Sequence, residues 1–259
     1  MKYIKYQTKD NKVFVGILED ETIYRLNYES IIDAIKDEED IKKYYLNNFK
    51  DCLDDVKVLT PVDPSKIVCV GLNYNDHANE LSMNIPSEPL LFLKPSTSVI
   101  AHEENIIYPK DTKKLDFEAE LGLVVLSEIN NKNNEDVFDI AYTIINDVTA
   151  RDLQEKDGQW TRSKSFDTFC PIGPVVATGI NPSNLRICSK VNNEIKQDSN
   201  TGYMIFSPKE LIHYISSIMT LKEGDLIATG TPPGIDHLEH GDKIEIIVEK
   251  IGILRNIVK

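Results

Sequence analysis

Apolar and acidic residues alternate over residues 115–121, and this is the most informative hydrophobic pattern in the chain. Successive side chains of a β-strand point to opposite faces, so a strand here places Asp116, Glu118 and Glu120 on one face. Neighbouring carboxylates on that face would be about 7 Å apart, from the rise of a strand. Residues 123–126 are wholly apolar. We therefore predict a single strand that carries three acids and continues into the interior.

The N-terminal part of the chain has the pattern of a small separate unit. Short alternating segments in residues 1–25, broken by charged turns, predict an antiparallel ribbon. Apolar residues at helical spacing among many charges predict helix in residues 28–49. Two prolines in residues 59–64 then interrupt periodic structure. We predict a small α/β appendage over residues 1–60 and a larger domain over residues 61–259.

Four short apolar runs predict strands in the larger domain. They cover residues 67–70, 90–93, 142–145 and 243–248. We expect the first two to be buried, and Cys69 fits the first as a small core hydrophobe. Strands outnumber helices, so the predicted fold class is mainly β with flanking helices (α+β).

One helix of this domain has a well-defined start. Ser207 is the predicted cap, Pro208 takes the first helical position, and Glu210 supplies the acid of a capping box. Apolar residues follow at helical spacing and predict a buried stripe. The stripe consists of Leu211, Ile212, Ile215, Ile218 and Met219.

Composition and charge argue against several classes of partner. Of the 259 residues, 41% are hydrophobic and 27% charged, as in an ordinary globular protein. The net charge of −13 argues against nucleic acid and anionic membranes, which attract basic patches. No apolar run approaches the roughly 20 residues that cross a bilayer, and the first residues lack the apolar core of a signal peptide. Four scattered cysteines without CxxC spacing predict reduced thiols and a cytoplasmic location.

Buried acids that lie close together repel one another and lose hydration, so they need a cation or a proton. All-oxygen ligands suit Mg²⁺, Mn²⁺ or Ca²⁺ better than Zn²⁺. Asp147 follows the strand predicted at residues 142–145 and is the natural third ligand beside Glu118 and Glu120. Two alternatives stay open: a solvated acidic face of an antiparallel strand, and a plain Asn-Asp turn at residues 146–147.

Further candidate residues lie on either side of these acids. His77 and Glu80 are three residues apart, so on a helix they share a face and can form a hydrogen bond. A carboxylate that orients the ring makes histidine a better base for activating water, although a solvated helix face shows the same pattern. Arg151, Gln154 and Lys164 could clamp a carboxylate substrate beside a metal, and surface charges would look the same.

The loop at residues 229–234 reads Thr-Gly-Thr-Pro-Pro-Gly. It could present backbone N–H groups to an anion, or form a plain turn. It lacks the Gly-Lys-Ser/Thr of a P-loop. The chain also lacks Gly-x-Ser-x-Gly, His-Glu-x-x-His and Gly-x-Gly-x-x-Gly, so no serine-hydrolase elbow, zinc-protease helix or dinucleotide-binding turn is predicted.

Six segments in order resemble the fumarylacetoacetate hydrolase family. Their order and spacing extend over roughly residues 65–259 and are far more specific than any one motif. Residues 1–60 resemble the small N-terminal domain of many members. The six segments are residues 71–77 (GLNYNDH), 92–95 (FLKP), 116–121 (DFEAEL), 146–152 (NDVTARD), 164–167 (KSFD) and 229–234 (TGTPPG).

This resemblance implies a mixed β-roll that is usually dimeric, so we expect a homodimer. It implies that Mg²⁺ or Mn²⁺ is held by the residues matching Glu118, Glu120 and Asp147. It also implies 2-oxo acid substrates that chelate the metal through carboxylate and keto oxygens. The resemblance therefore favours a metal site over the two alternatives for the acids.

The resemblance also assigns roles to side chains near the metal. His77 and Glu80 match the lid dyad of the acylpyruvase and oxaloacetate decarboxylase subgroup, in which a closing helix brings in the base. Lys164 would contact the substrate and share in catalysis. The expected substrate-binding residues are Arg151, Gln154, Lys164 and Thr231.

The function predicted from these features is metal-dependent hydrolysis of the C–C bond of an acylpyruvate, decarboxylation of oxaloacetate, or both. In the hydrolysis, His77 oriented by Glu80 would activate the attacking water. One alternative is an isomerase or tautomerase of a related oxo-diacid, such as oxaloacetate or 2-hydroxyhepta-2,4-diene-1,7-dioate. Another is a non-catalytic protein that binds a metal or a small acid and keeps the site for stability.

Overall fold

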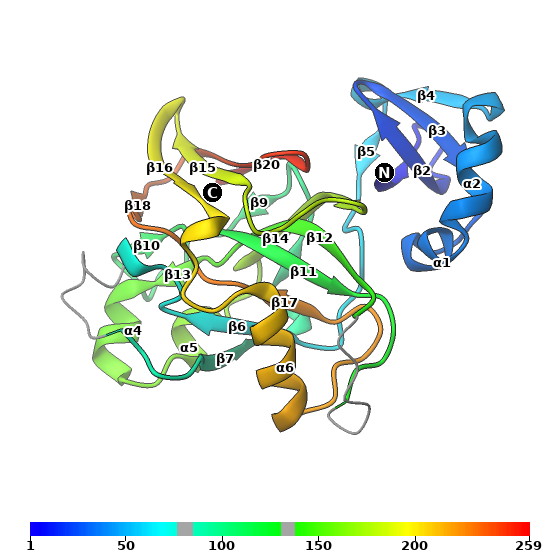
Figure 1. Ribbon diagram of the computed structural model, residues 1–259. Helices are drawn as coiled ribbons and strands as arrows, with labels where there is room; N and C mark the ends of the chain where they lie inside the picture. The colour runs from blue at the N-terminus through cyan, green and yellow to red at the C-terminus, as the bar shows by residue number, and fades with distance from the viewer. Residues whose placement is uncertain (77–84, 131–137) are drawn as a thin grey trace.

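The computed structural model describes residues 1–76, 85–130 and 138–259 and shows a mainly β fold with few helices, as predicted (Figure 1). The strands of the large sheet are β1 Lys2–Gln7, β2 Val13–Glu19, β3 Thr22–Leu26, β4 Lys50–Cys52, β5 Lys57–Val58, β6 Ile67–Gly71, β7 Leu90–Lys94, β8 Val99–Ile100, β11 Ala119–Val125, β12 Ile140–Asn146, β14 Cys170–Ala177 and β17 Leu226–Ala228.

Two smaller sheets and several helices complete the described structure. The five-stranded sheet has β9 Asn105–Ile106, β15 Arg186–Val191, β16 Glu194–Asn200, β19 Lys243–Val248 and β20 Gly252–Val258. The three-stranded sheet has β10 Leu115–Asp116, β13 Thr149–Ala150 and β18 His237–Leu238. The helices are α1 Ile31–Lys36, α2 Glu38–Tyr44, α4 Arg151–Asp157, α5 Thr161–Lys164 and α6 Pro208–Ile218, and the short 3₁₀ helices are η1 Tyr45–Asn47, η2 Leu53–Asp55, η3 Ser96–Ser98 and η5 Thr201–Tyr203.

Strand β11 lies inside the large sheet, whose main path is β4-β3-β2-β1-β14-β12-β11-β17-β6-β7. It pairs antiparallel with both β12 and β17, and all seven of its residues are buried. Strand β6 is also fully buried and runs parallel to β17. Strands covered on both faces read as continuous apolar runs, which explains the patterns that predicted them.

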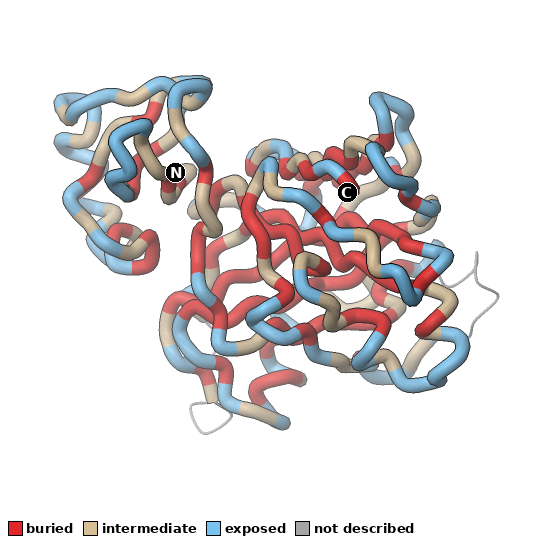
Figure 2. Tube along the Cα trace, turned by 180° about the vertical axis from the view of Figure 1, so that it is seen from behind, coloured by how far each residue is buried: buried red, intermediate tan, exposed pale blue. Residues whose placement is uncertain are grey.

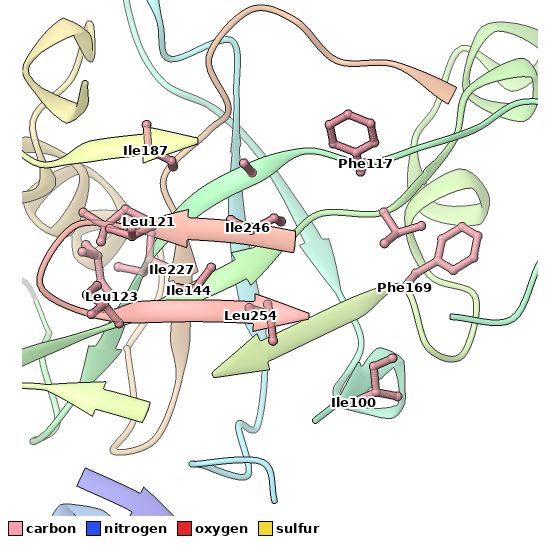
Figure 3. Packing of buried hydrophobic residues seen from close by; sticks show 14 of the residues in the cluster. Ile100, Phe117, Leu121, Leu123, Ile144, Phe169, Ile187, Ile227, Ile246 and Leu254 are labelled. Carbon is pink, nitrogen blue, oxygen red and sulfur yellow. The ribbon is translucent and has the colours of Figure 1, made fainter. Parts of the chain in front are cut away.

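The main core fills the space between the large sheet and the five-stranded sheet. Leu121 of β11 and Ile144 of β12 point toward Ile246 of β19 and Leu254 of β20, which are all buried (Figure 3). Buried positions follow the strands of the larger domain, and exposed positions collect on the loops (Figure 2). This core covers one face of β11 and β12, and a second buried cluster that includes Val124 and Ile145 covers the other, so both strands are fixed from both faces.

The N-terminal residues form the predicted antiparallel ribbon β1-β2-β3, with α1 and α2 in the stretch predicted to be helical. This part extends to one side of the larger body (Figure 1). Strand β1 also pairs with β14, where Tyr3 lies opposite Val176, so backbone pairing crosses the predicted boundary. The division into two domains at residue 60 stays a prediction.

The strand predicted over residues 115–125 is wrong in one respect, because it is broken at residues 117–118. The first part, β10, pairs with β13 and β18, whereas the second, β11, pairs with β12 and β17. At the break, the Glu118 N–H donates to the Asn146 side-chain oxygen at 3.1 Å instead of to a strand partner. The two halves therefore belong to different sheets, which separates Asp116 from the other two acids.

Two predictions of burial are also wrong. Strand β7 was expected in the interior, but it ends the main path of the large sheet, and Leu90 and Leu93 are about half exposed. The helix α6 starts at its predicted capping box at Ser207, and Leu211 and Ile215 are buried. Ile218, however, is 56% exposed, because it lies in the last turn of α6, which ends there.

The four cysteines are free thiols. Cys69, Cys170 and Cys188 are buried and Cys52 is exposed, so the prediction of unpaired cysteines and of a core position for Cys69 is confirmed. Among the described residues, no helix combines the length and the apolar character that crossing a membrane requires. The cytoplasmic location stays a prediction.

Candidate metal centre and substrate pocket

Antiparallel pairing of β11 with β12 brings three carboxylates together. Ala119 lies opposite Asn146, so Glu118, just before β11, meets Asp147, just after β12. The Asp147 N–H donates to the Glu118 carbonyl at 3.0 Å. Glu120 is two residues further along β11 and faces the same side as Glu118. The ligand oxygens of Glu118, Glu120 and Asp147 lie within 4.8 Å of one another, and all three residues are buried.

Three cations contact two of these carboxylates. The Lys164 ammonium, at the end of α5, donates to Glu118 at 2.8 Å and to Asp147 at 2.7 Å. Lys94, at the end of β7, pairs with Asp147, and Arg151 pairs with Glu118. Burial alone would raise the pKa of Glu118, but Lys164 and Arg151 hold that pKa well below its ordinary value. Glu118 and Asp147 are therefore charge-balanced by residues of the protein.

Glu120 differs, because no Lys, Arg or His of the described residues forms an ion pair with it. Burial raises the pKa of Glu120 well above its ordinary value, and the neighbouring Asp147 and Glu118 raise it further. The described partner of the Glu120 carboxylate is the Gly230 N–H, at 2.7 Å. Gly230 has φ +92°, and a Cβ there would lie 2.7 Å from the Asn73 Cβ. One N–H of the loop at 229–234 is thus directed to the Glu120 carboxyl group, and binding of an anion by this loop stays a prediction.

The residues present fit an oxygen-coordinated divalent cation. The donor set consists only of carboxylate oxygens, which favours Mg²⁺, Mn²⁺ or Ca²⁺ over softer metals. The three acids converge closely enough to share one ion, and Glu120 contributes a buried carboxylate that a cation would neutralise. The prediction that Glu118, Glu120 and Asp147 come together is met by this geometry.

A pocket of about 310 Å³ opens directly onto this cluster. Its polar lining includes Glu118, Glu120, Arg151, Gln154 and Lys164. The rest of the lining is mostly apolar, which suits the binding of a small organic acid with a polar end. The apolar lining includes Leu72, Pro86, Leu90, Phe92 and Trp160.

The four residues predicted to bind substrate all line this pocket. Arg151 and Gln154 are one helical turn apart on α4, and the Arg151 guanidinium donates to the Gln154 side-chain oxygen at 2.6 Å. The Thr231 hydroxyl donates to the Ala119 carbonyl at 2.9 Å and accepts from Gln197 at 2.8 Å. Its hydroxyl hydrogen is therefore used inside the protein, and a substrate contact of Thr231 stays a prediction.

The proposed base and its partner, His77 and Glu80, lie outside the described residues. The chain on either side of them is at the pocket, because Leu72 and Pro86 both line it. None of the histidines among the described residues lines this pocket. The lid-dyad role of His77 and Glu80 stays a prediction.

Comparison with known proteins identifies the family of this chain. Residues 66–259 match the family model described as fumarylacetoacetate (FAA) hydrolase, C-terminal. The chain belongs to the fumarylacetoacetate hydrolase family. The match covers the large sheet from β6 onward and every residue of the three-carboxylate cluster. The resemblance inferred from the six sequence segments is therefore confirmed.

Named relatives of this family member have related activities. The mitochondrial oxaloacetate tautomerase of Rattus norvegicus is 39% identical over 215 residues, covering 78% of this chain and 69% of the relative. The structure of 2-hydroxyhepta-2,4-diene-1,7-dioate isomerase from Mycobacterium marinum is 34% identical, has a TM-score of 0.83, and covers 100% of this chain and 98% of its own.

A second structure shows the shared fold at lower identity. Maleylpyruvate hydrolase from Sphingobium sp. SYK-6, in complex with manganese(II) ion and pyruvate, has a TM-score of 0.83 and 24% identity. The match covers 100% of this chain and 98% of the hydrolase chain. Members of the family are thus enzymes, named as tautomerases, isomerases and hydrolases.

Sequence reasoning missed three residues that this site uses. Lys94 was noted only as part of a motif, yet its ammonium is fully buried against Asp147. Trp160 lines the pocket and packs edge-on against Phe92, at 5.2 Å between ring centroids. From the sequence, Asp116 has no predicted role beyond the acidic face of the strand, but it is 3% exposed and pairs with Arg151 of the pocket. A lysine at the end of an apolar strand is the signal that could have revealed Lys94.

Proposed function

We propose that this protein is a divalent-metal-dependent enzyme that acts on a 2-oxo dicarboxylic acid. The observation that carries the proposal is the pocket in which three buried carboxylates adjoin Arg151, Gln154 and Lys164. Glu118, Glu120 and Asp147 would hold Mg²⁺ or Mn²⁺. A bound ion would act as a Lewis acid that stabilises negative charge developing on the 2-oxo group of the substrate.

The side chains around the acids have distinct roles in this proposal. Arg151 and Gln154 present N–H groups to a substrate carboxylate and fix its orientation. Burial would lower the pKa of Lys164, yet Asp147 and Glu118 raise it above its ordinary value, so the ammonium stays protonated. Lys164 therefore acts as a fixed positive charge and hydrogen-bond donor rather than as a base.

Keto–enol tautomerisation of oxaloacetate is the reaction we place first. It needs stabilisation of an enolate and a proton exchanged between carbon and oxygen, without an attacking water. The 39% identity to an oxaloacetate tautomerase supports this choice over the other oxo-diacids. Hydrolysis of an acylpyruvate and decarboxylation of oxaloacetate share the same enolate chemistry and remain the second candidate.

Replacing His77 by alanine distinguishes these reactions. If His77 oriented by Glu80 activates water, the variant should lose acylpyruvate hydrolysis while tautomerising oxaloacetate at close to the wild-type rate. The loss should be about 100-fold or more, the usual contribution of a positioned base. The measurement follows the enol absorbance of oxaloacetate and the consumption of acetylpyruvate with Mg²⁺ present. Wild-type protein that acts on neither compound would refute the proposed function.

Adding Mg²⁺ or Mn²⁺ to metal-free protein should raise its melting temperature. An ion that binds only the folded state at 100 times its Kd stabilises it by about 2.7 kcal/mol. For a chain of this size that corresponds to about 5–10 °C. Differential scanning fluorimetry with EDTA, Mg²⁺, Mn²⁺ or K⁺ as the control measures the shift. A shift without turnover of any oxo acid would favour a non-catalytic metal-binding protein.

A further inference from the structure

The three-stranded sheet brings together Asp116 and His237, two residues without a role in the proposed function, and Asp116 contacts Arg151 of the pocket. In its register, Asp116 of β10 lies opposite Thr149 of β13 on one side and His237 of β18 on the other. Arg151 begins α4 directly after β13, and its backbone N–H donates to the Lys114 carbonyl at 2.8 Å. This short sheet therefore fixes the distance between Asp116 and the start of the helix that carries Arg151.

Each of the two oxygens of the buried Asp116 carboxylate contacts a different side chain. One oxygen accepts from the Arg151 Nε at 2.7 Å, toward the pocket. The other contacts the His237 Nδ1 at 2.5 Å, toward the surface, where the imidazole is about half exposed. An ionised carboxylate only accepts hydrogen bonds, so the His237 Nδ1 carries the hydrogen of this contact.

Three of the five N–H groups of the Arg151 guanidinium have described partners. Its Nε donates to Asp116, one terminal nitrogen to Glu118 at 2.5 Å, and the other to Gln154 at 2.6 Å. One hydrogen on each terminal nitrogen is not used by these bonds, and because Arg151 lines the pocket these hydrogens can serve a ligand there. Because the guanidinium is planar, the bond at Nε fixes the direction of both remaining N–H groups.

We infer that Asp116 and His237 are positioning residues that aim the Arg151 guanidinium at the substrate carboxylate. The inference deepens the proposed function, on which it rests. His237 holds one oxygen of Asp116, so that the other stays aligned with Nε of the arginine. Neither residue lines the pocket, so both act on substrate binding only through Arg151.

Kinetic variants test this inference. Asp116→Ala should raise KM for oxaloacetate by about 10-fold or more, the value of a hydrogen bond to a charged group, and change kcat less. His237→Ala should act in the same direction by about 2- to 3-fold, and as a half-exposed residue it is a safe second variant if Asp116→Ala fails to fold. In an Arg151→Ala background, Asp116→Ala should raise KM no further, because the arginine through which it acts is gone.

A matched control separates positioning from stability. Asp51 also binds an arginine and a second side chain, Arg25 at 2.9 Å and Tyr6 at 2.5 Å, in the N-terminal part of the chain. Asp51→Ala should lower the melting temperature and leave KM unchanged. If Asp116→Ala and His237→Ala behave like this control, with an unchanged KM, the inference is overturned.

A second readout keeps the inference testable if the protein turns over no oxo acid. The Arg151 Nε–H should give a slowly exchanging ¹⁵N-correlated NMR signal, assigned by its loss in Arg151→Lys. In Asp116→Ala that signal should broaden or exchange faster, and His237→Ala should show the same effect more weakly. A signal unchanged in both variants overturns the positioning role, whereas an inactive wild type with the expected NMR changes refutes only the proposed function.

Discussion

Replacing Glu120 by glutamine is expected to reduce turnover about 100- to 1,000-fold and to abolish the effect of Mg²⁺ on the melting temperature. Glu120 is the acid of the cluster without an ion pair to the described residues, so its charge has the least compensation inside the protein. A lost contribution of about 3–4 kcal/mol to transition-state stabilisation corresponds to this loss of rate. Metal-free Glu120→Gln should unfold close to the wild-type temperature, because the Glu120 side chain has no ion pair with the described residues and the glutamine oxygen can still accept the Gly230 N–H.

This expectation is checked by measuring rate and melting temperature with and without Mg²⁺. Glu239→Gln, at an exposed position that does not line the pocket, is the control for loss of a carboxylate and should behave as wild type. A Glu120→Gln protein that keeps its Mg²⁺-dependent stabilisation and its activity would remove Glu120 from the ligand set. A protein destabilised without metal would instead show that the carboxylate has a structural role.

Replacing Lys164 by methionine is expected to lower the free energy of unfolding of the metal-free protein by about 3–5 kcal/mol. The ammonium is 2% exposed and neutralises both Glu118 and Asp147, so its loss leaves buried charge uncompensated. Mg²⁺ should recover part of this loss, because a divalent cation would neutralise the same two acids. Turnover should fall even with Mg²⁺ present, because a donor to the substrate is absent.

Urea unfolding in EDTA and in Mg²⁺ measures this effect. Lys113→Met replaces an exposed lysine that does not line the pocket and should change stability by less than about 0.5 kcal/mol in either condition. An equal loss for Lys164→Met with and without Mg²⁺ would show that the ion and the ammonium do not neutralise the same acids. Together, the two variants distinguish a residue proposed to bind the metal, Glu120, from a residue that neutralises the other proposed ligands, Lys164.

The metal candidates could be predicted because their positions depend on local periodicity. Glu118 and Glu120 are two apart, which places them on one face of a strand. Asp147 follows an apolar strand, and antiparallel pairing of two such strands brings it to Glu118. These relations need only the alternation of side chains along a strand and the pairing of one strand with another. The resemblance to the family then predicted the fold and the class of substrate.

The remaining parts of the site depend on tertiary pairing that no periodicity encodes. Strands β10, β13 and β18 have two residues each, too few for a pattern, so neither Asp116 nor its partner His237 could be placed. The break at residues 117–118 is invisible in a sequence that alternates through it. The apolar sequence of β7 predicts an interior strand. Its position at the edge depends on the order of strands in the sheet, which the sequence does not show.

The distribution of charge around the pocket has a consequence for the order of binding. With every acid ionised, Asp116, Glu118, Glu120 and Asp147 outnumber Lys94, Arg151 and Lys164 by one negative charge. A dicarboxylate approaching a protein of net charge −13 would then meet local repulsion as well. A divalent cation reverses the local sign to one positive charge. In the proposed function a bound metal would therefore serve capture of the substrate as well as chemistry, and we expect ordered binding in which the metal binds before the substrate.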